Sequence, residues 1–128
     1  MSKINRWVPA IILMIIIFLA SGTPSTILPD YGVWDTFIKK GGHVLGYALL
    51  ANSFWYGFGF QAEKAWKAWG LAVIYAMTDE YHQSFTSGRH PSLVDVFLFD
   101  GGGSLLGLST AAAVFFYFAR TSKKEVTE

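Results

Sequence analysis

The chain has 128 residues, of which 52% are hydrophobic, 17% aromatic and 15% charged, with a formal net charge of +1 and no cysteine. This composition is too apolar for an ordinary soluble domain, and the length leaves no space for a Rossmann unit or a P-loop domain beside the apolar stretches. The near-zero charge excludes the basic surface of a nucleic-acid-binding module, and the lack of cysteine excludes disulfides, thiolate metal sites and cysteine nucleophiles.

Four apolar stretches are long enough to cross a membrane, because a bilayer core about 30 Å thick requires about 20 helical residues. They predict one all-α domain over residues 1–128, an integral membrane bundle of four transmembrane helices. These helices are expected over about residues 4–21, 42–60, 64–83 and 93–118.

The first helix follows the basic residues Lys3 and Arg6 and continues through an apolar run that ends at Ala20. Its length and its basic start are typical of a transmembrane helix with a cytoplasmic N-terminus. A cleaved signal peptide is the alternative, because Ala20, Ser21 and Gly22 satisfy the small-residue rule for a cleavage site.

Residues 21–41 interrupt the apolar pattern with Pro24, Pro29 and Gly32. This composition predicts a re-entrant or surface loop after the first helix. The link at residues 61–64 is short, so the second and third helices are expected to be antiparallel neighbours. These connections predict a compact bundle.

The basic residues at the helix ends predict an orientation with both termini in the cytoplasm. The inner residues are then Lys3, Arg6, Lys64, Lys67, Arg120, Lys123 and Lys124, and the outer ones are Lys39, Lys40 and Arg89. Both loop regions rich in polar residues, 21–43 and 79–95, lie on the outer face in this arrangement. The charged tail from residue 121 is interpreted as a solvated end.

Lys39, His43 and Tyr47 follow one another at intervals of four, so on a helix they form one polar stripe that runs from the outer surface into the bundle. Each residue also has a separate structural interpretation. The lysine can reach the interface, the histidine can cap a turn and the tyrosine can anchor at the headgroup level. The three together favour a functional face.

The third helix carries Ala68, Ala72, Ala76 and Glu80 at the same interval, so a neighbouring backbone can approach the small residues and the face ends in a carboxylate. Gln83 lies beside this carboxylate, in an ionisable stretch at the end of an otherwise apolar helix. Ionisable groups at membrane depth indicate a functional site. The alternative places them in the headgroup region, where charge is tolerated.

Residues 84–92 predict a turn by their Ser, Gly and Pro content, in which Gly88 reverses the backbone and Arg89 is displayed. Arginine is suited to binding a carboxylate or a phosphate through two parallel hydrogen bonds. We therefore expect its partner to be Glu80, Asp95 or a lipid phosphate.

The fourth helix is expected to begin at Ser92 as N-cap, with Asp95 at the third helical position, which is close to a capping box. Asp100 lies about two turns inside the helix, where a carboxylate is either protonated or paired. Its candidate partners are Arg89, Lys39 and His43. Gly103 and Gly107 form a G-x-x-x-G pair, which we expect to pack against the alanine face of the third helix.

The order of these residues resembles the VanZ-like membrane protein family over about residues 21–118. The similarity rests on Lys39-x3-His43-x3-Tyr47, Asp79-Glu80-x-His82-Gln83, Gly88-Arg89, Ser92-x2-Asp95 and the helix with Gly103 and Gly107. The resemblance implies a multi-pass protein of the bacterial inner membrane, in a class associated with low-level teicoplanin resistance. It also implies that the family's characteristic polar positions are Lys39, His43, Glu80, Gln83, Arg89, Asp95 and Asp100. Ser87 replaces the usual proline before Gly-Arg.

The expected function is the binding of a lipid-linked or lipophilic cell-envelope molecule, such as an anionic lipid, in a polar pocket on the outer face. The expected lining is Lys39, His43, Tyr47, Glu80, Gln83, Arg89, Asp95 and Asp100. The alternative is an intramembrane enzyme that acts on a lipid headgroup or a cell-wall precursor. In that case Glu80 or Asp95 is the general base, and His43 or His82 moves the proton.

Three further interpretations remain open. A zinc site would use His43, His82, His90, Glu80 and Asp95, but their spacing is not a dedicated zinc pattern, and we expect no metal or cofactor. A transport or proton-relay function would use Asp100 and Glu80. The polar residues can also form an internal network that determines how the helices pack, without any ligand.

Overall fold

The computed structural model of the protein describes the backbone of residues 4–125 and the side chains of residues 5–121. All regular elements in this part of the chain are helical, which confirms the predicted all-α fold. The short turns η1 to η3 are 3-10 helical, whereas η4 is a π-helical segment. The elements are η1 (Ile4–Trp7), α1 (Val8–Ser21), η2 (Gly32–Trp34), α2 (Asp35–Gly57), η3 (Ala62–Lys64), α3 (Ala65–Gln83), α4 (Leu93–Asp95), η4 (Val96–Gly101) and α5 (Gly102–Glu125).

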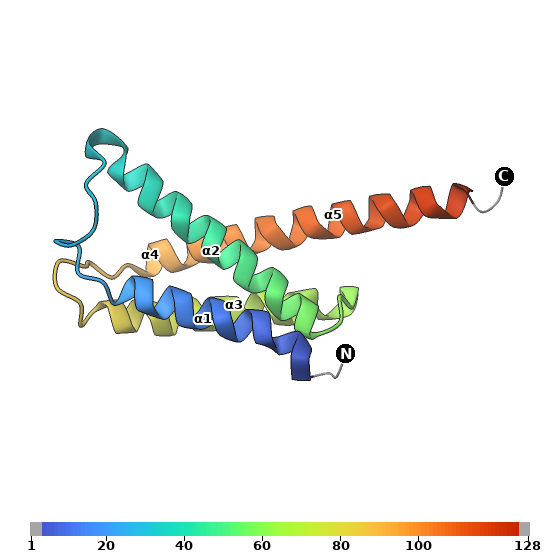
Figure 1. Ribbon diagram of the computed structural model, residues 1–128, viewed down its shortest axis with the longest axis horizontal. Helices are drawn as coiled ribbons and strands as arrows, with labels where there is room; N and C mark the ends of the chain where they lie inside the picture. The colour runs from blue at the N-terminus through green and yellow to red at the C-terminus, as the bar shows by residue number, and fades with distance from the viewer. Residues whose placement is uncertain (1–3, 126–128) are drawn as a thin grey trace.

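The helices form a short bundle from which α5 projects. In Figure 1, α1 and α3 lie side by side, α2 crosses the bundle, and α5 extends beyond the other helices toward the C-terminus. The contact between α1 and α3 includes the Tyr75 hydroxyl, which donates to the carbonyl of Met14 at 2.5 Å. The loops that follow α1 and α3 meet at the opposite end of the molecule from the N-terminus.

The second helix begins earlier than predicted. It starts at Asp35 rather than near residue 42, so the loop after α1 is shorter than the expected 21–41. Asp35 lies in the first turn, where a carboxylate complements the helix dipole, and it accepts a hydrogen bond from Lys39 at 2.7 Å. These contacts stabilise the first turns although Gly41 and Gly42 follow them.

The fourth apolar stretch starts at Leu93 as predicted but differs in two ways. It contains the π-helical segment η4, which includes Asp100 and Gly101, and Trp69 of α3 donates from Nε1 to the Gly101 carbonyl at 3.0 Å. The helix also continues to Glu125, beyond the predicted end near residue 118. Residues 126–128 lie outside the described residues.

The glycine pair of α5 packs on a different helix from the one expected. A side-chain carbon at Gly103 would lie 2.6 Å from the Val44 carbonyl oxygen, and one at Gly107 would lie 2.7 Å from the β-carbon of Ala48. Both neighbours belong to α2, so the predicted contact with the alanine face of α3 is wrong. The glycines allow the backbones of α2 and α5 to cross closely.

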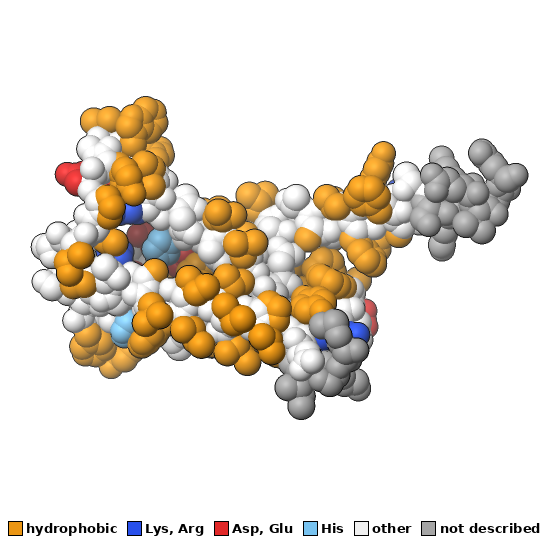
Figure 2. Space-filling model, viewed as in Figure 1, with side chains coloured by type: hydrophobic (Ala, Val, Ile, Leu, Met, Phe, Trp, Pro, Cys, Tyr) orange, Lys and Arg blue, Asp and Glu red, His pale blue; other side chains and the backbone are white. Residues whose placement is uncertain are grey.

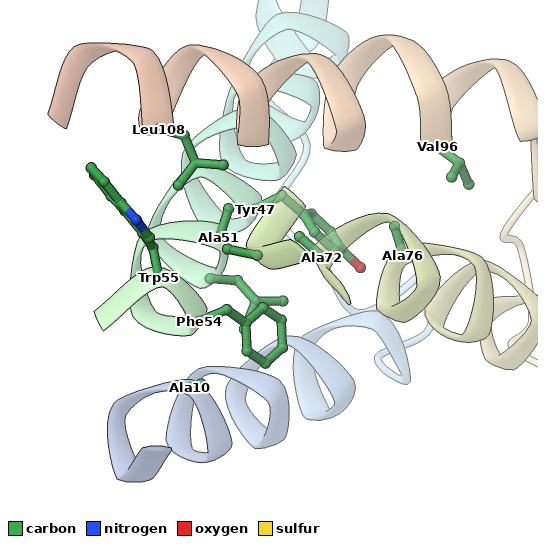
Figure 3. Close-up of a cluster of buried hydrophobic side chains, with 11 residues drawn as sticks. Ala10, Tyr47, Ala51, Phe54, Trp55, Ala72, Ala76, Val96 and Leu108 are labelled. Atoms are coloured by element: carbon green, nitrogen blue, oxygen red, sulfur yellow. The ribbon is translucent and has the colours of Figure 1, made fainter. Parts of the chain in front are cut away.

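The alanine face of α3 is instead buried in the core. Ala68, Ala72 and Ala76 have no exposed surface, and they belong to one cluster with apolar side chains of α1, α2 and α5. Figure 3 shows Tyr47 between α2 and α3, with Ala72 and Ala76 beside it. The small residues therefore leave space for an aromatic ring between the two helices.

One helix of the described part, over residues Leu93–Thr121, is long and apolar enough to cross a membrane. The segment Asn5–Ser21 is also apolar but shorter, and the other described helices do not meet the same criterion. The bundle thus contains four principal helices as predicted, whereas length and composition identify a single candidate span.

The close crossing of α2 and α5 predicts that alanine substitutions at two adjacent glycines, Gly102 and Gly103, have opposite effects on stability. Gly103→Ala is expected to lower the free energy of unfolding by about 2 kcal/mol, because the new methyl group would force the two backbones apart. Gly102→Ala, whose methyl group would lie 3.9 Å from the nearest atom, is expected to raise it by about 0.5–1 kcal/mol through helix propensity. Thermal unfolding followed by circular dichroism measures both, and equal effects would contradict the crossing.

Candidate functional site

Two adjoining cavities occupy the end of the bundle where α1 and α3 end and where α2 and α4 begin. Figure 2 shows charged and histidine side chains in a recess at this end, whereas much of the rest of the visible face is hydrophobic. The first cavity has a volume of about 230 Å³ and is lined mostly by polar and charged residues. The second has a volume of about 280 Å³ and a more apolar lining. They share Leu28, Lys39, His43 and Arg89.

Most of the predicted site residues line these cavities. The first is lined by Lys39, His43, Glu80, Gln83, Arg89 and Asp95, and the second by Lys39, His43, Tyr47 and Arg89. Asp100 lines neither cavity but contacts one of the lining residues. The structure therefore brings the predicted set together, although several of the expected pairings differ.

Two ion pairs lie along the first cavity. The Lys39 ammonium is 2.7 Å from Asp35, and the Lys40 ammonium is 3.0 Å from Asp95 and 4.2 Å from the centre of the Phe99 ring. The hydrogen bond from Lys39 lowers the pKa of Asp35, which lies ahead of the second predicted span. Because all four groups are partly exposed, these pairs contribute little stability, and their main effect is to position the two ammonium groups.

His43 and Asp100 form a pair behind the cavities. The Nδ1 atom of His43 lies 2.9 Å from Oδ1 of Asp100, whose surface is 1% exposed. This confirms His43 as the partner among the three candidates for Asp100. The His43 ring also stacks at 17° on Tyr47. The contacts orient the imidazole at the wall that the two cavities share.

Asp79 joins three helices although the sequence did not single it out as a site residue. It is 3% exposed and accepts hydrogen bonds from Ser21 of α1 at 2.5 Å, from Tyr47 of α2 at 3.2 Å and from Gln83 of α3 at 3.1 Å. The available signal was its spacing of four from Gln83, on the end of α3 that follows the alanine face. Asp79 also lines the second cavity.

Glu80 completes the N-cap of the fourth helix instead of pairing with arginine. Its carboxylate accepts a hydrogen bond from the backbone N–H of Ser92, and the Ser92 hydroxyl accepts from the Asp95 N–H at 3.4 Å. Ser92 is therefore the N-cap as predicted. In a capping box the third helical residue would accept the N-cap N–H. Here Glu80 does so, which leaves the Asp95 side chain free to bind Lys40.

Arg89 has neither of its two predicted protein partners. Its Nε atom donates to the carbonyl of Thr23 and its Nη2 atom to the carbonyl of Ala20, both at 3.3 Å. Helix C-termini leave carbonyl groups without intrahelical partners, which explains this position at the end of α1. Within the described part of the chain, no carboxylate lies within ion-pair distance of Arg89.

The two loops at this end contact each other directly. The Ser25 N–H donates to the Ser87 carbonyl at 3.3 Å, and Gly88 has a φ of +73° beside the Ser25 hydroxyl. The predicted reversal at Gly88 is thus confirmed, and a side chain there would collide with Ser25. These contacts place Arg89 over the end of α1.

Several lining residues were not predicted: Ser25, Leu28, Thr36, Lys40, His90 and Phe99 at the first cavity, and Ile17, Ala20, Gly42 and Gly46 at the second. Lys40 was noted only as an outer basic residue. Its role depends on Asp95, 55 residues further along the chain, so no local pattern could reveal it.

The residues of the alternative zinc site are not arranged as metal ligands, although His43, Glu80, His90 and Asp95 all line the first cavity. His82 stacks on Phe18 with ring centres 4.0 Å apart, and its Nδ1 atom lies 3.3 Å from the Ser21 hydroxyl. Among the described residues, no three histidine, aspartate or glutamate side chains are arranged to hold a metal ion. The geometry therefore does not support the zinc interpretation.

Comparison of the chain with protein-family models, with curated proteins and with solved structures found no match. The resemblance to the VanZ-like family therefore stays a prediction.

The His43–Asp100 pair can be tested by a double-mutant cycle. His43→Ala is expected to lower the free energy of unfolding by about 3 kcal/mol, because it leaves the buried Asp100 carboxylate without its hydrogen bond. Asp100→Ala should cost less, about 1–2 kcal/mol, because the imidazole that it leaves unpaired is partly exposed. The double variant should lose clearly less than the sum of the two single losses. Chemical denaturation of the four proteins measures this, and additive losses would show that the pair is not coupled.

Proposed function

We propose that the protein is a multi-pass protein of the bacterial inner membrane, of the VanZ-like type, that binds an anionic lipid or a lipid-linked cell-envelope molecule at the two cavities. The bundle would have four spans with both termini in the cytoplasm and the cavities on the outer face. On the basis of the resemblance, the proposal also includes a contribution of the protein to teicoplanin tolerance.

The distribution of polar and apolar side chains supports a membrane setting. Asp79, Glu80 and Asp100 are 3%, 7% and 1% exposed, whereas large apolar side chains cover the outer helix faces. The exposed apolar residues include Ile11, Ile12, Ile15, Ile16 and Leu19 of α1 and Leu105, Leu106, Phe115 and Phe116 of α5. Contiguous apolar surface of this kind marks a contact with lipid or protein. It also explains how short helices with polar interiors can remain in a bilayer.

The observation that carries the ligand proposal is Arg89. Its guanidinium lies at the wall shared by both cavities and is held by two backbone carbonyls. No carboxylate of the described residues lies within ion-pair distance of it, although Asp35, Glu80 and Asp95 line the first cavity and Asp79 the second. Lys39 and Lys40, by contrast, are each paired with an aspartate. An arginine without an ion-pair partner at a cavity wall is suited to bind a phosphate group.

Native mass spectrometry of the protein released gently from its own membrane tests this proposal. The wild-type protein is expected to retain a phosphate-bearing lipid, and Arg89→Gln should lose most of it. Lys67→Gln is the matched control, because it removes one positive charge from the other end of α3, where the ammonium lies 5.4 Å from the centre of the Trp66 ring. Arg89→Lys keeps the charge and should retain part of the lipid.

Two results would contradict lipid binding at Arg89. One is full lipid retention by Arg89→Gln. The other is an equal loss of lipid in Arg89→Gln and Lys67→Gln, which would indicate a nonspecific effect of charge.

The geometry of His43 favours a lipid-directed enzyme as the second candidate. Asp100 engages the Nδ1 atom of the imidazole, and the ring lies at both cavities. An aspartate that orients a histidine in this way leaves Nε2 available for proton transfer to or from a substrate. Glu80 is a weaker candidate for the general base, because its carboxylate is engaged by the Ser92 N–H.

The enzymatic alternative makes a separate prediction. If a phospholipid headgroup is modified, His43→Gln should abolish turnover of lipid extracted from the native membrane while lipid retention persists. Liquid chromatography and mass spectrometry of the incubated extract measure turnover. If the lipid extract is unchanged after incubation with wild-type protein, the enzymatic alternative is contradicted and only the proposal of lipid binding remains.

A further inference from the structure

We infer that the second cavity holds a hydrocarbon chain of the bound lipid, in a groove between α1 and α2, while the anionic headgroup occupies the first. This inference depends on the proposed function and specifies which part of the site binds the apolar part of the ligand. The groove is defined by Ile17 and Ala20 on α1, Leu28 in the following loop, and Gly42 and Gly46 on α2.

The continuity of the two cavities is the first argument. Arg89 and His43 line both, so a phosphate bound at Arg89 would lie at the entrance to the second cavity. The first cavity contains the ion pairs of Lys39 and Lys40. The second exposes mainly apolar surface, from Ile17, Ala20, Leu28, Gly42 and Gly46, although Ser21, Tyr47 and Asp79 also line it beside the residues that it shares with the first cavity. A site with a charged part directly beside an apolar part matches an amphiphile better than a free phosphate or a pure hydrocarbon.

The glycines of α2 are the second argument. A side-chain carbon added at Gly42 or at Gly46 would meet no protein atom within 4 Å, unlike one at Gly103 or Gly107. Glycine destabilises a helix interior relative to alanine. Close packing explains the presence of glycine in a helix only where a neighbouring backbone approaches. No neighbour approaches Gly42 or Gly46. Because they are one turn apart and line the second cavity, their missing side chains widen the groove.

The occupant that fits this groove is a membrane-lipid chain rather than a second copy of the protein. The groove adjoins Arg89, which has no ion-pair partner among the described residues, so an occupant with a negative group directly beside a narrow apolar part fits it. A phospholipid has that order of groups. The chain is already out of water in a bilayer or a micelle, so the groove contributes to binding through close packing of the chain against its walls rather than through the hydrophobic effect.

The experiment compares glycine variants that differ in whether they face the groove. The protein, purified in an uncharged detergent, is titrated with dioleoyl phosphatidic acid and with uncharged dioleoylglycerol, and bound lipid is measured by native mass spectrometry. Gly42→Leu and Gly46→Leu fill the groove. Gly41→Leu is the matched control, because Gly41 is equally open and lies on the same helix but lines neither cavity.

The wild-type protein and Gly41→Leu are both expected to prefer phosphatidic acid to dioleoylglycerol. The two proteins should also bind phosphatidic acid with the same affinity. Gly42→Leu and Gly46→Leu should bind phosphatidic acid several-fold more weakly, because the leucine side chain occupies the space of the chain carbons and removes their packing contacts. All three leucine variants should unfold at or above the wild-type temperature, since they replace a helical glycine without a clash. Gly46→Ala should also weaken the binding of phosphatidic acid, but by less. It replaces the leucine variants in the comparison if one of them fails to fold.

The possible failures are distinguishable. If wild-type protein shows no preference for phosphatidic acid, the proposed function fails and this inference fails with it. If the preference persists but Gly42→Leu and Gly46→Leu bind as Gly41→Leu does, the headgroup site stands and the groove is refuted. If the groove variants convert a dimer to a monomer without changing lipid affinity, a second copy occupies the groove, which also refutes the inference.

Discussion

The burial of two aspartates inside an apolar bundle is the constraint on which the rest of the structure depends. A buried carboxylate must be matched by hydrogen-bond donors, and neither Asp79 nor Asp100 has enough of them on its own helix. Asp79 obtains them from Ser21 and Tyr47 on two other helices, and Asp100 from His43. These requirements position α1, α2, α3 and η4 relative to one another. They also orient the imidazole at the cavity wall, so the polar network that holds the bundle together also shapes the site.

The helix ends explain why the cavities form at one end of the bundle. There α1 and α3 terminate while α2 and α4 begin, so unpaired backbone groups of both kinds come together. Arg89 donates to carbonyls at the end of α1, and Glu80 accepts from the first N–H of the fourth helix. Arg89 and Glu80, which the sequence predicted as possible partners of each other, therefore form hydrogen bonds with backbone groups instead. One consequence is that Arg89 has no ion-pair partner among the described residues, although Asp35, Glu80 and Asp95 line the same cavity.

Glycine has three different roles along this chain, and only their surroundings distinguish them. Gly103 and Gly107 allow two backbones to cross, and Gly88 adopts a left-handed conformation in a turn. Gly42 and Gly46 face open space beside a cavity. A G-x-x-x-G pattern predicts close packing in general, and it did so correctly for α5, although the partner was α2 instead of α3. The same spacing at Gly42 and Gly46 has the opposite consequence, because no helix approaches them.

The sequence by itself determined the helical fold, the approximate positions of four helices, the Ser92 cap, the turn at Gly88 and the polar stripe of Lys39, His43 and Tyr47. These features depend on local periodicity and on contacts within one or two turns, which a linear pattern contains. The tertiary structure alone decided that Asp79 joins three helices, that Lys40 binds Asp95, that Arg89 binds the end of α1 and that α5 packs on α2. Each of these contacts joins residues far apart in the chain. The choice among chemically equivalent partners depends on which helix ends meet in space, and local spacing does not contain that information.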